Sequence, residues 1–505
     1  MRHVAVIDHG KSNTRVVIFD AQGRQVDQRA CPTPGDASGP YPVEDVAALI
    51  PFVTGALKHF AARYAIATIV PVAHGAAGAL VDADGLVLPV LDYEYSPPDA
   101  INAAYDALRP SFAETASPRL PAGHNLGRQL YLLQTRFPEA VARANAFLPL
   151  AQYWAWVLSG VAVSEVTSLG AHTDLWNPWQ RCLSALVADQ GWGRLIPPMR
   201  KAGEVIGPLR PEMARATGLA ETTPVLAGLH DSNASLLPYL SAGPTSSAPT
   251  SSSVKSGGET IGGDTTGGEP SGGATSRRTA PVAVVSTGTW IIVMNVGGDA
   301  SQLDPAADML ANVDVLGRPT PSARFMGGRE FAEIAGDDAP ATLDGARAVI
   351  ESGALALPSF SDQGGPWAGV KGRLLGPLPP IAGLRSALAC LYCALVTHDL
   401  VTRLGIAGPL YVDGPFAANA VWLAAMAGLH DAGIVPRAGA SPAAGAAMLA
   451  LAASEPTLQL PVQRQTQPRP QPQPQSQAQP KTQDRLPGLE RYRQRWVEAV
   501  ARKTG

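Results

Sequence analysis

Two aspartates directly follow apolar segments of this 505-residue chain, and both could serve proton or metal chemistry. Asp8 ends the apolar run Val4–Ile7, where a buried carboxylate is costly unless a partner such as hydrated Mg²⁺ lies beside it. An aspartate that closes a turn explains the same residue without a metal. Asp231 follows residues 224–230 at the expected start of a helix, where it either caps the helix or accepts the proton of a substrate hydroxyl. The second role suits phosphoryl transfer to an alcohol, where positioning matters more than base strength.

A strand, a polar glycine turn and a second strand occur in that order over Val4–Asp20 and again over Val282–Asn295. Each glycine lets backbone N–H groups approach an anion, and the hydroxyl or amide side chains beside it can donate to phosphate oxygens. One such turn is usually structural. Because there are two, we predict that they hold a polyphosphate from opposite sides.

Two further segments could form a pocket for a polyol. His74 and Gly75 follow the apolar run Ile69–Val72, and the cluster Asp92–Tyr95 follows the apolar run Val87–Leu91. Small residues beside a polar ring, and aromatic rings beside carboxylates, suit such a ligand, although a lone histidine is more often structural. A separate glycine turn at Asp413–Asn419 permits close approach to a flat ligand near a helix N-terminus, and taken alone it is only a strand-to-helix turn.

These residues lie at the ends of apolar strands that alternate with helical patterns, which predicts an α/β protein. Strands are expected at Val4–Ile7, Val16–Phe19, Ile69–Val72, Gly78–Val81, Val225–Ala227, Val282–Ser286, Ile291–Asn295 and Leu410–Val412. Helices are expected at Val43–Tyr64, Leu126–Arg136, Ala140–Ala144, Leu150–Leu158, Leu384–Leu404 and Ala417–Ala427.

Composition excludes several classes of protein. The net charge of −3, from 39 basic and 42 acidic residues, argues against a main role in gripping nucleic acid or an anionic membrane surface. Four cysteines cannot form a disulfide framework, and Cys390 and Cys393 lie in an apolar helical pattern without a second pair, so core packing is expected there instead of zinc. With so few cysteines a reducing cytosol is the expected location, and no export or membrane-spanning segment is expected.

Two segments of biased composition interrupt the chain. Residues 241–281 are rich in Ser, Gly and Thr and are expected to be a flexible insertion, and residues 456–485 alternate Pro and Gln. We therefore expect an N-terminal domain over 1–222, a C-terminal domain over 223–455 that carries the insertion, the Pro/Gln-rich segment, and a C-terminal helix within 486–505.

The motifs together resemble those of the FGGY family of carbohydrate kinases, within the actin-like ATPase superfamily. Asp8–Arg15 is similar to the family's first phosphate hairpin, Ser286–Trp290 to its second, and Gly228–Asp231 to the segment of its catalytic aspartate. The forms of the last two motifs are closest to the L-fuculokinase and L-rhamnulokinase branch. The resemblance implies two actin-like (ribonuclease H-like) α/β domains around a central cleft, with the sugar mainly on the first and ATP mainly on the second.

The same resemblance implies the roles of individual residues. Asp231 would be the general base, and Asp8 would organise Mg²⁺ through water. The residues expected to contact ATP are Gly10, Lys11, Ser12, Asn13, Arg15, Thr287, Gly288, Thr289, Gly414 and Asn419, and those expected to contact the sugar are His74, Gly75, Tyr93, His230 and Asn233. The chain departs from the branch at His74, which replaces an aromatic residue, and at Ala77, which replaces an aspartate. Asp413–Phe416 replaces a Gly-Gly-Gly loop.

The implied function is ATP- and Mg²⁺-dependent phosphorylation of a hydroxyl of a ketose, either a deoxyhexulose such as L-fuculose or L-rhamnulose or a pentulose. The expected partner is therefore a small sugar, with no nucleic acid and no membrane. Whether the chain forms a homodimer is left open by the sequence. Two alternatives remain. The altered loop and Ala77 would suit a sugar or nucleotide sensor without catalysis, and the Pro/Gln-rich segment would suit an actin-like ATPase that acts on protein partners.

Overall fold

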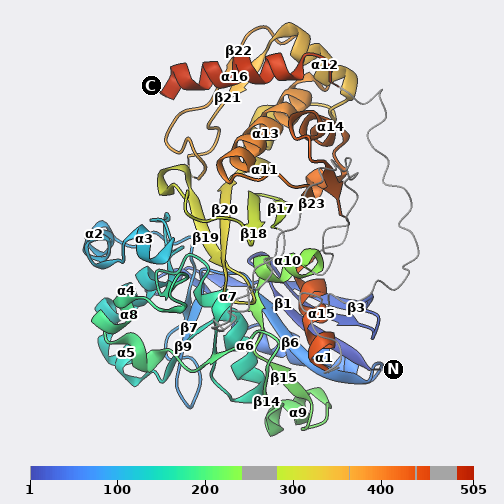
Figure 1. Cartoon of the computed structure of the whole chain (residues 1–505). Coiled ribbons are helices and arrows are strands. Elements are labelled where there is room, and N and C mark those ends of the chain that lie inside the picture. Colours follow the sequence, from blue (N-terminus) through green and yellow to red (C-terminus); the bar gives the residue numbers. More distant parts are fainter. Residues whose placement is uncertain (1, 241–280, 363, 438–440, 455–485, 505) are drawn as a thin grey trace, which may run out of the picture.

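The computed structural model describes residues 2–240, 281–362, 364–437, 441–454 and 486–504, which form two α/β lobes, one above the other (Figure 1). The expected insertion, apart from Pro281, and the Pro/Gln-rich segment lie outside the described residues.

The first lobe is built on a mixed sheet with the strand order β14-β15-β6-β1-β2-β3, in which β16 also pairs with β6. Its strands are β1 (His3–His9), β2 (Asn13–Phe19), β3 (Gln25–Pro32), β6 (Ile66–Ala73), β14 (Val205–Pro208), β15 (Pro224–Leu226) and β16 (Leu229–His230). The smaller strands of this lobe are β4 (Gly35–Asp36), β5 (Val43–Glu44), β7 (Gly78–Val81), β8 (Val90–Leu91), β9 (Ala146–Pro149), β10 (Ser164–Glu165), β11 (Trp176–Asn177), β12 (Cys182–Leu183) and β13 (Met199–Arg200).

The sheet of the second lobe has the order β19-β20-β18-β17-β23-β24 and repeats the arrangement of the first. In each sheet the first hairpin strand, β1 or β17, lies between its antiparallel partner and a parallel strand, β6 or β23. Its strands are β17 (Val282–Thr287), β18 (Ile291–Val296), β19 (Met309–Val313), β20 (Pro319–Phe325), β23 (Leu410–Asp413) and β24 (Ile434–Pro436), with β21 (Leu355–Leu357) and β22 (Arg373–Leu375) apart from it.

Helices cover both faces of each sheet. Those within residues 2–240 are α1 (Ile50–Ala61), α2 (Asp99–Leu108), α3 (Phe112–Thr115), α4 (Leu126–Arg136), α5 (Pro138–Arg143), α6 (Leu150–Ser159), α7 (Val166–Leu169), α8 (Ala185–Asp189), α9 (Pro211–Thr217) and α10 (Asp231–Leu240). Those described after residue 280 are α11 (Gly327–Ala335), α12 (Leu343–Ser352), α13 (Leu384–Arg403), α14 (Ala420–Leu429), α15 (Pro442–Ser454) and α16 (Leu489–Thr504).

The unbroken apolar sequence of β1 reflects burial on both faces of its sheet. Ala5 and Ile7 pack in one core with α1 and α6, whereas Val4 and Val6 pack in a second core with α10 and α15. The strand is thereby fixed from both sides, and the polar residues that follow it are held at a defined edge.

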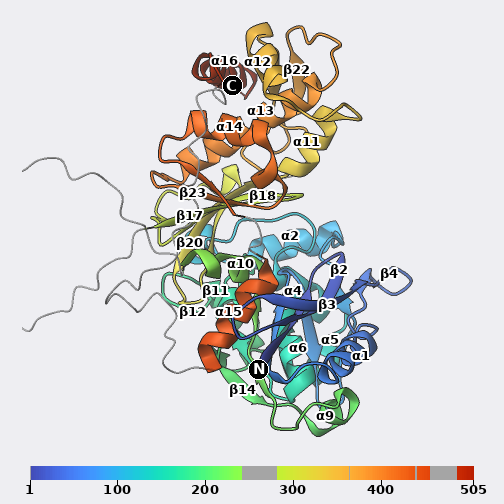
Figure 2. The same cartoon turned by 90° about the vertical axis from the view of Figure 1, so that its right-hand side faces the viewer.

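Helix α10 connects the cores of the two lobes. Ala234 and Leu237 face the first sheet and α15, and Leu236 and Tyr239 face β17 and β18 of the second sheet. Figure 2 shows α10 and α15 side by side below the second sheet. The residue that begins α10 therefore lies where the two lobes meet.

Strand pairing divides the chain differently from the expected boundary at residue 222. The segment after that position forms β15 and β16, which pair with β6, and the late helix α15 packs on β1, β2 and β6. Residues 224–230 and Pro442–Ser454 thus belong to the first lobe, because the chain returns to it after building the second.

Two helices needed the structure for their interpretation. The helix expected over Val43–Tyr64 begins only at Ile50, because Val43 and Glu44 pair as β5 with β4 and β8. Helix α13 is long and apolar enough to cross a membrane, but its sequence is largely buried in the core of the second lobe.

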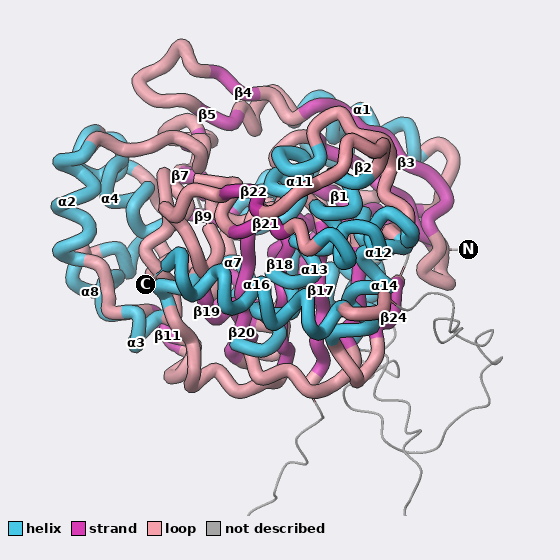
Figure 3. The backbone as a smooth tube through the Cα atoms, turned by 90° about the horizontal axis from the view of Figure 1, so that it is seen from above, coloured by secondary structure: helices cyan, strands magenta, loops and turns pink. Residues whose placement is uncertain are grey.

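Helix α16 lies across this lobe (Figure 3), where the Tyr492 hydroxyl donates to the Ala354 carbonyl.

Candidate active site

Three parallel strands end at the same edge of the first sheet and bring together residues from distant parts of the sequence. Strand pairing places Asp8 of β1 opposite Val72 of β6, and Val72 opposite Leu229 of β16. Asp8 at the end of β1, His74 directly after β6 and Asp231 directly after β16 therefore meet at this edge. The carboxyl ends of parallel strands are a common place for ligand sites.

Asp8 is buried and forms an ion pair with Arg15, its cross-strand partner on β2. Burial raises the pKa of Asp8 and outweighs the opposing effect of Arg15, and the nearby charge of Asp231 adds to the rise. The two carboxylates are thus close enough to repel each other, and a cation between them would relieve that repulsion.

Asp231 is the first residue of α10, and its side chain remains 29% exposed. Its Oδ1 accepts the backbone N–H of Ser232 at 2.5 Å and lies 3.5 Å from Nε2 of His230. This N–H belongs to the next residue and is not the bond of a helix cap, which would come from two or three residues further on. The contacts that tie Asp231 to the helix start involve one carboxylate oxygen, which is compatible with a base role for the other.

The first glycine turn is closed by a bond from the Gly10 N–H to the Asn13 carbonyl at 3.0 Å. Lys11, which the family resemblance assigns to ATP, instead donates to Asp92 at 2.5 Å and lies 4.7 Å from the centre of the Tyr93 ring. Its ammonium group is thus held on the side of the expected sugar residues. Ser12 and Asn13 are exposed at the tip of the turn.

The second glycine turn is fastened to the turn after β23. The Thr287 hydroxyl donates to the Asp413 carbonyl at 2.5 Å and accepts the Phe416 N–H at 3.1 Å. Gly414, between them, has φ +84°, and a Cβ atom there would lie 1.8 Å from the Thr287 carbonyl oxygen. Only glycine fits, so the two segments expected to contact the nucleotide are brought together, with Thr289 exposed beside them.

Asn419, the remaining residue expected at ATP, has a structural use for its side chain. Its Oδ1 accepts the Trp422 N–H at 2.9 Å and so caps α14, while its Nδ2 lies 3.3 Å from the Cys390 sulfur. Both ends of the amide are thus engaged.

The residues expected to contact the sugar lie together around Asp231. The rings of His74 and Tyr93 are 5.5 Å apart, and the Gly75 backbone packs on the His230 ring. Asn233 places its Nδ2 3.4 Å from His230 Nδ1, and its buried Oδ1 has no hydrogen-bond partner in the described part of the chain. Such an orphaned acceptor suits a ligand hydroxyl.

A second group of residues near this site carried no sequence signal. Glu44 on β5 contacts His9 and His74, and Trp154 on α6 contacts His9. Neither Glu44 nor Trp154 belongs to a motif, and Glu44 lies inside a segment that was expected to be a helix. Only its neighbouring histidines, each placed after an apolar strand, could have hinted that a buried carboxylate was needed.

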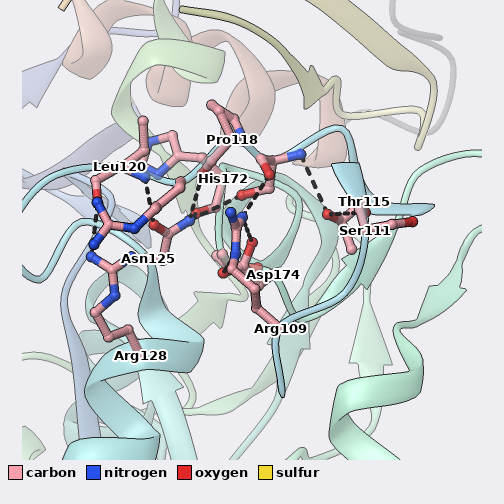
Figure 4. A network of polar contacts seen from close by, with 12 residues as sticks. Arg109, Ser111, Thr115, Pro118, Leu120, Asn125, Arg128, His172 and Asp174 are labelled. Carbon is pink, nitrogen blue, oxygen red and sulfur yellow. Dashed lines mark hydrogen bonds and ion pairs between the residues drawn. The ribbon is translucent and has the colours of Figure 1, made fainter. Parts of the chain in front are cut away.

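The loop after α7 carries His172 to the same region in a strained conformation, with φ +49°. Two contacts hold this loop (Figure 4). Asn125 Nδ2 donates to the His172 carbonyl at 3.1 Å, and Asp174, two residues after His172, pairs with Arg109 at 2.8 Å. Burial lowers the pKa of His172 well below its usual value, and the charge of Arg324 on β20 adds to this. A residue of the second lobe therefore acts electrostatically on the first.

A cavity of about 980 Å³ lies elsewhere, between the segment before β14, the turn before β20 and the end of α15. It is lined in part by Met199, Lys201, Leu316 and Leu449, and none of the expected site residues borders it.

Comparisons with known proteins were consistent with one another. The N-terminal domain of the FGGY family of carbohydrate kinases matches residues 123–238, and the domain described as carbohydrate kinase FGGY, C-terminal, matches residues 279–460. The structure of a carbohydrate kinase from Novosphingobium aromaticivorans is 34% identical, covers 99% of both chains and has a TM-score of 0.80. A xylulose kinase from Rhodospirillum rubrum, at 16% identity, covers 99% of both chains with a TM-score of 0.74. An L-fuculokinase from Salmonella typhi is 25% identical over 259 residues, which are 48% of this chain and 54% of that protein, so the match spans about half of each.

Proposed function

The chain belongs to the FGGY family of carbohydrate kinases, and we propose that it transfers the terminal phosphoryl group of ATP to a hydroxyl of a ketose. The observation that carries the proposal is the meeting of Asp8, His74 and Asp231 at the carboxyl edge of three parallel strands. The two-lobed actin-like architecture, common to the family, adds a second glycine turn from the other lobe.

Asp231 is proposed as the general base. It lies at the junction of the lobes, where α10 touches both sheets, and its partial exposure lets a sugar hydroxyl reach it. The hydroxyl proton passes to its carboxylate as the sugar oxygen bonds to the terminal phosphorus and the bond from that phosphorus to the leaving ADP breaks. The fixed helix start holds the carboxylate in place. Tyr93, His230 and Asn233 orient the sugar, with the orphaned Asn233 Oδ1 accepting one of its hydroxyls.

Asp8 is proposed to hold Mg²⁺ through water. The donor chemistry fits, because a buried carboxylate whose pKa is raised by burial and by a second carboxylate gains from a cation beside it. When bound, Mg²⁺ neutralises phosphate charge during the transfer. Gly10, Ser12, Asn13 and Arg15 of one turn, and Thr287–Thr289 with Gly414 of the other, would hold the nucleotide phosphates.

The proposed substrate is a deoxyhexulose such as L-fuculose or L-rhamnulose, or a pentulose. The partial likeness to an L-fuculokinase supports the deoxyhexulose. We also infer a cytoplasmic location, since the four cysteines are all free thiols.

The direct test is ADP release in a coupled assay with L-fuculose, L-rhamnulose, L-ribulose and D-xylulose. Asp231→Asn should lower kcat on the accepted ketose by about 10²-fold or more while ATP binding and the melting temperature stay unchanged. Asp189→Asn, the same change at an exposed end of α8, is the matched control and should be silent.

Three results would contradict the proposal. ATP binding without turnover of any ketose would favour a sensor. ATP hydrolysis that ignores sugars would favour an ATPase that acts on proteins. Near-normal turnover by Asp231→Asn would remove this residue from the base role.

A further inference from the structure

One buried carboxylate connects two histidines that follow different strands of the first sheet. Glu44 is 3% exposed, and its Oε1 lies 2.5 Å from Nε2 of His9 and 3.0 Å from Nε2 of His74. Its other oxygen lies 3.8 Å from the Lys11 ammonium. The cluster thus joins the first glycine turn to the segment that follows β6.

The partners of the two rings fix where their protons lie. The Trp154 indole, which can only donate, points its N–H at Nδ1 of His9 at 2.7 Å, so the proton of a neutral His9 is on Nε2 and is donated to Glu44. Nδ1 of His74 lies 2.8 Å from the Gly75 carbonyl, which can only accept, and its Nε2 faces Glu44. Both nitrogens of His74 therefore donate, and its ring is an imidazolium.

A metal ion is the competing explanation, because ligand atoms of His9, Glu44 and His74 all lie within 4.8 Å of one another. A neutral histidine that binds a metal through Nε2 carries its proton on Nδ1 and donates it to an acceptor. At His9 that position faces the N–H of Trp154, which is itself a donor. The cluster is therefore a hydrogen-bonded ion pair.

The electrostatics of the cluster agree with this assignment. Burial would lower the pKa of His74, but the hydrogen bond and the charge of Glu44 outweigh it, and the charge of Asp231 also contributes, so the pKa is raised. Burial opposes the ionised form of Glu44 as well, but the hydrogen bonds of both histidines keep its pKa below the usual range.

A short chain of contacts leads from this ion pair to Asp231. His74 is followed by Gly75, where a Cβ atom would come within 2.5 Å of Nε2 of His230. That ring directly precedes Asp231 and lies 3.5 Å from its Oδ1. The position of the His74–Gly75 backbone thus limits where the His230 ring, and with it the Asp231 carboxylate, can lie.

We propose that Glu44 is a positioning residue: it holds His74 as a buried imidazolium, and the anchored His74–Gly75 backbone keeps His230 and Asp231 in their reactive arrangement. The effect on turnover rests on the kinase function proposed above. The protonation pattern does not depend on that function and is tested separately.

The first experiment reads the protonation of the rings in the whole protein labelled with ¹⁵N-histidine. Long-range ¹H–¹⁵N correlations at pH 7, assigned by the loss of signals in His74→Gln and His9→Gln, should show His74 protonated on both nitrogens and His9 on Nε2 alone. In Glu44→Gln the His74 ring should become neutral. A neutral His74 in the wild type, a His9 protonated on Nδ1, or spectra that change when a chelator removes bound metal would each overturn the assignment.

The second experiment measures kinetics on the ketose identified by the panel. Glu44→Gln should lower kcat by more than 10-fold, with a smaller change in the KM for the sugar and none in ATP binding. Glu221→Gln, at an exposed turn, is the matched control and should behave as wild type. An unchanged kcat in a folded Glu44→Gln protein whose His74 is neutral would refute the positioning role. If no ketose is turned over by the wild type, the kinase proposal fails and the ring assignments still stand or fall by the spectra.

Discussion

The two lobes repeat one strand arrangement, but they surround their glycine turns with different chemistry. The first turn is bordered by charge: Asp8 pairs with Arg15, and Lys11 lies between Asp92 and Glu44. The second is joined to the turn after β23 through the Thr287 hydroxyl and backbone atoms, and one carboxylate, that of Asp413, accepts the Gly414 N–H within that turn. The hairpin is therefore a scaffold, and the segments that the fold places around it decide what each copy can do.

The difference divides the proposed reaction between the lobes. Charges that can hold a metal ion and accept a proton lie at one edge of the first sheet, where burial makes their ionisation sensitive to each neighbour. The second turn offers close backbone packing, which depends on shape more than on charge. Substitutions in the first turn should thus affect catalysis, and substitutions in the second should affect stability and nucleotide binding.

The largest effect on turnover is expected for Asp8→Asn, beside the charged first turn. Losing this carboxylate should lower kcat by about 10²-fold or more, because the cation has no anionic anchor. Since burial raises the pKa of Asp8 in the fold, the neutral amide should leave the melting temperature unchanged or higher.

Asp20→Asn is the matched control for Asp8→Asn on the same hairpin. Hydrogen bonds from the backbone and side chain of Arg24 lower the pKa of Asp20, so this amide should lower stability and leave kcat unchanged. If both variants lost stability and kept kcat, the charges at the first turn would be structural.

Beside the second turn, Gly414→Ala should destabilise the second lobe by about 2 kcal/mol or more and weaken ATP binding, because the added Cβ meets the Thr287 carbonyl. Gly405→Ala separates the strain of a positive φ from the clash of the added Cβ. Gly405 also has a positive φ, but a Cβ there would meet no atom within 4 Å. That variant should cost about 1 kcal/mol and leave ATP binding intact. Equal effects in urea unfolding and calorimetric titration would show that close packing at Gly414 is not what matters.

The ion pair of Glu44 and His74 should give the first lobe its own pH dependence. Because the pKa of His74 is raised in the fold, the pair stabilises fully below about pH 6.5, the unfolded value, and this stabilisation is lost as the pH rises through the folded value. On the acid side the loss begins below the unfolded pKa of Glu44, about 4.5, and is complete once the pH falls below the lower folded value. The difference in unfolding free energy between wild type and Glu44→Gln should thus shrink from pH 6 to pH 9 in urea titrations, and a difference that grew would contradict the assigned charges.

The sequence predicted what depends on local pattern. Apolar strands that alternate with helical patterns predicted an α/β fold, and the resemblance of the motifs to the FGGY family implied its actin-like type; the structure and its relatives confirm both. It could not predict Glu44, whose role arises only when β5, β1 and β6 meet in space. Nor could it show that Lys11 turns toward Asp92, because two carboxylates distant in sequence compete with any phosphate for that cation.

The smallest effect concerns Asn419, where the family resemblance and the structure suggest different roles. Its side chain caps α14 and contacts Cys390, so Asn419→Ala should cost about 1 kcal/mol of stability and leave the KM for ATP unchanged. Thr342→Ala removes a comparable cap, from α12, and should lower the melting temperature by a similar amount. A several-fold rise in the KM for ATP in Asn419→Ala alone would show that this amide leaves its cap to bind nucleotide. The second lobe would then bind ATP through side chains as well as through backbone shape.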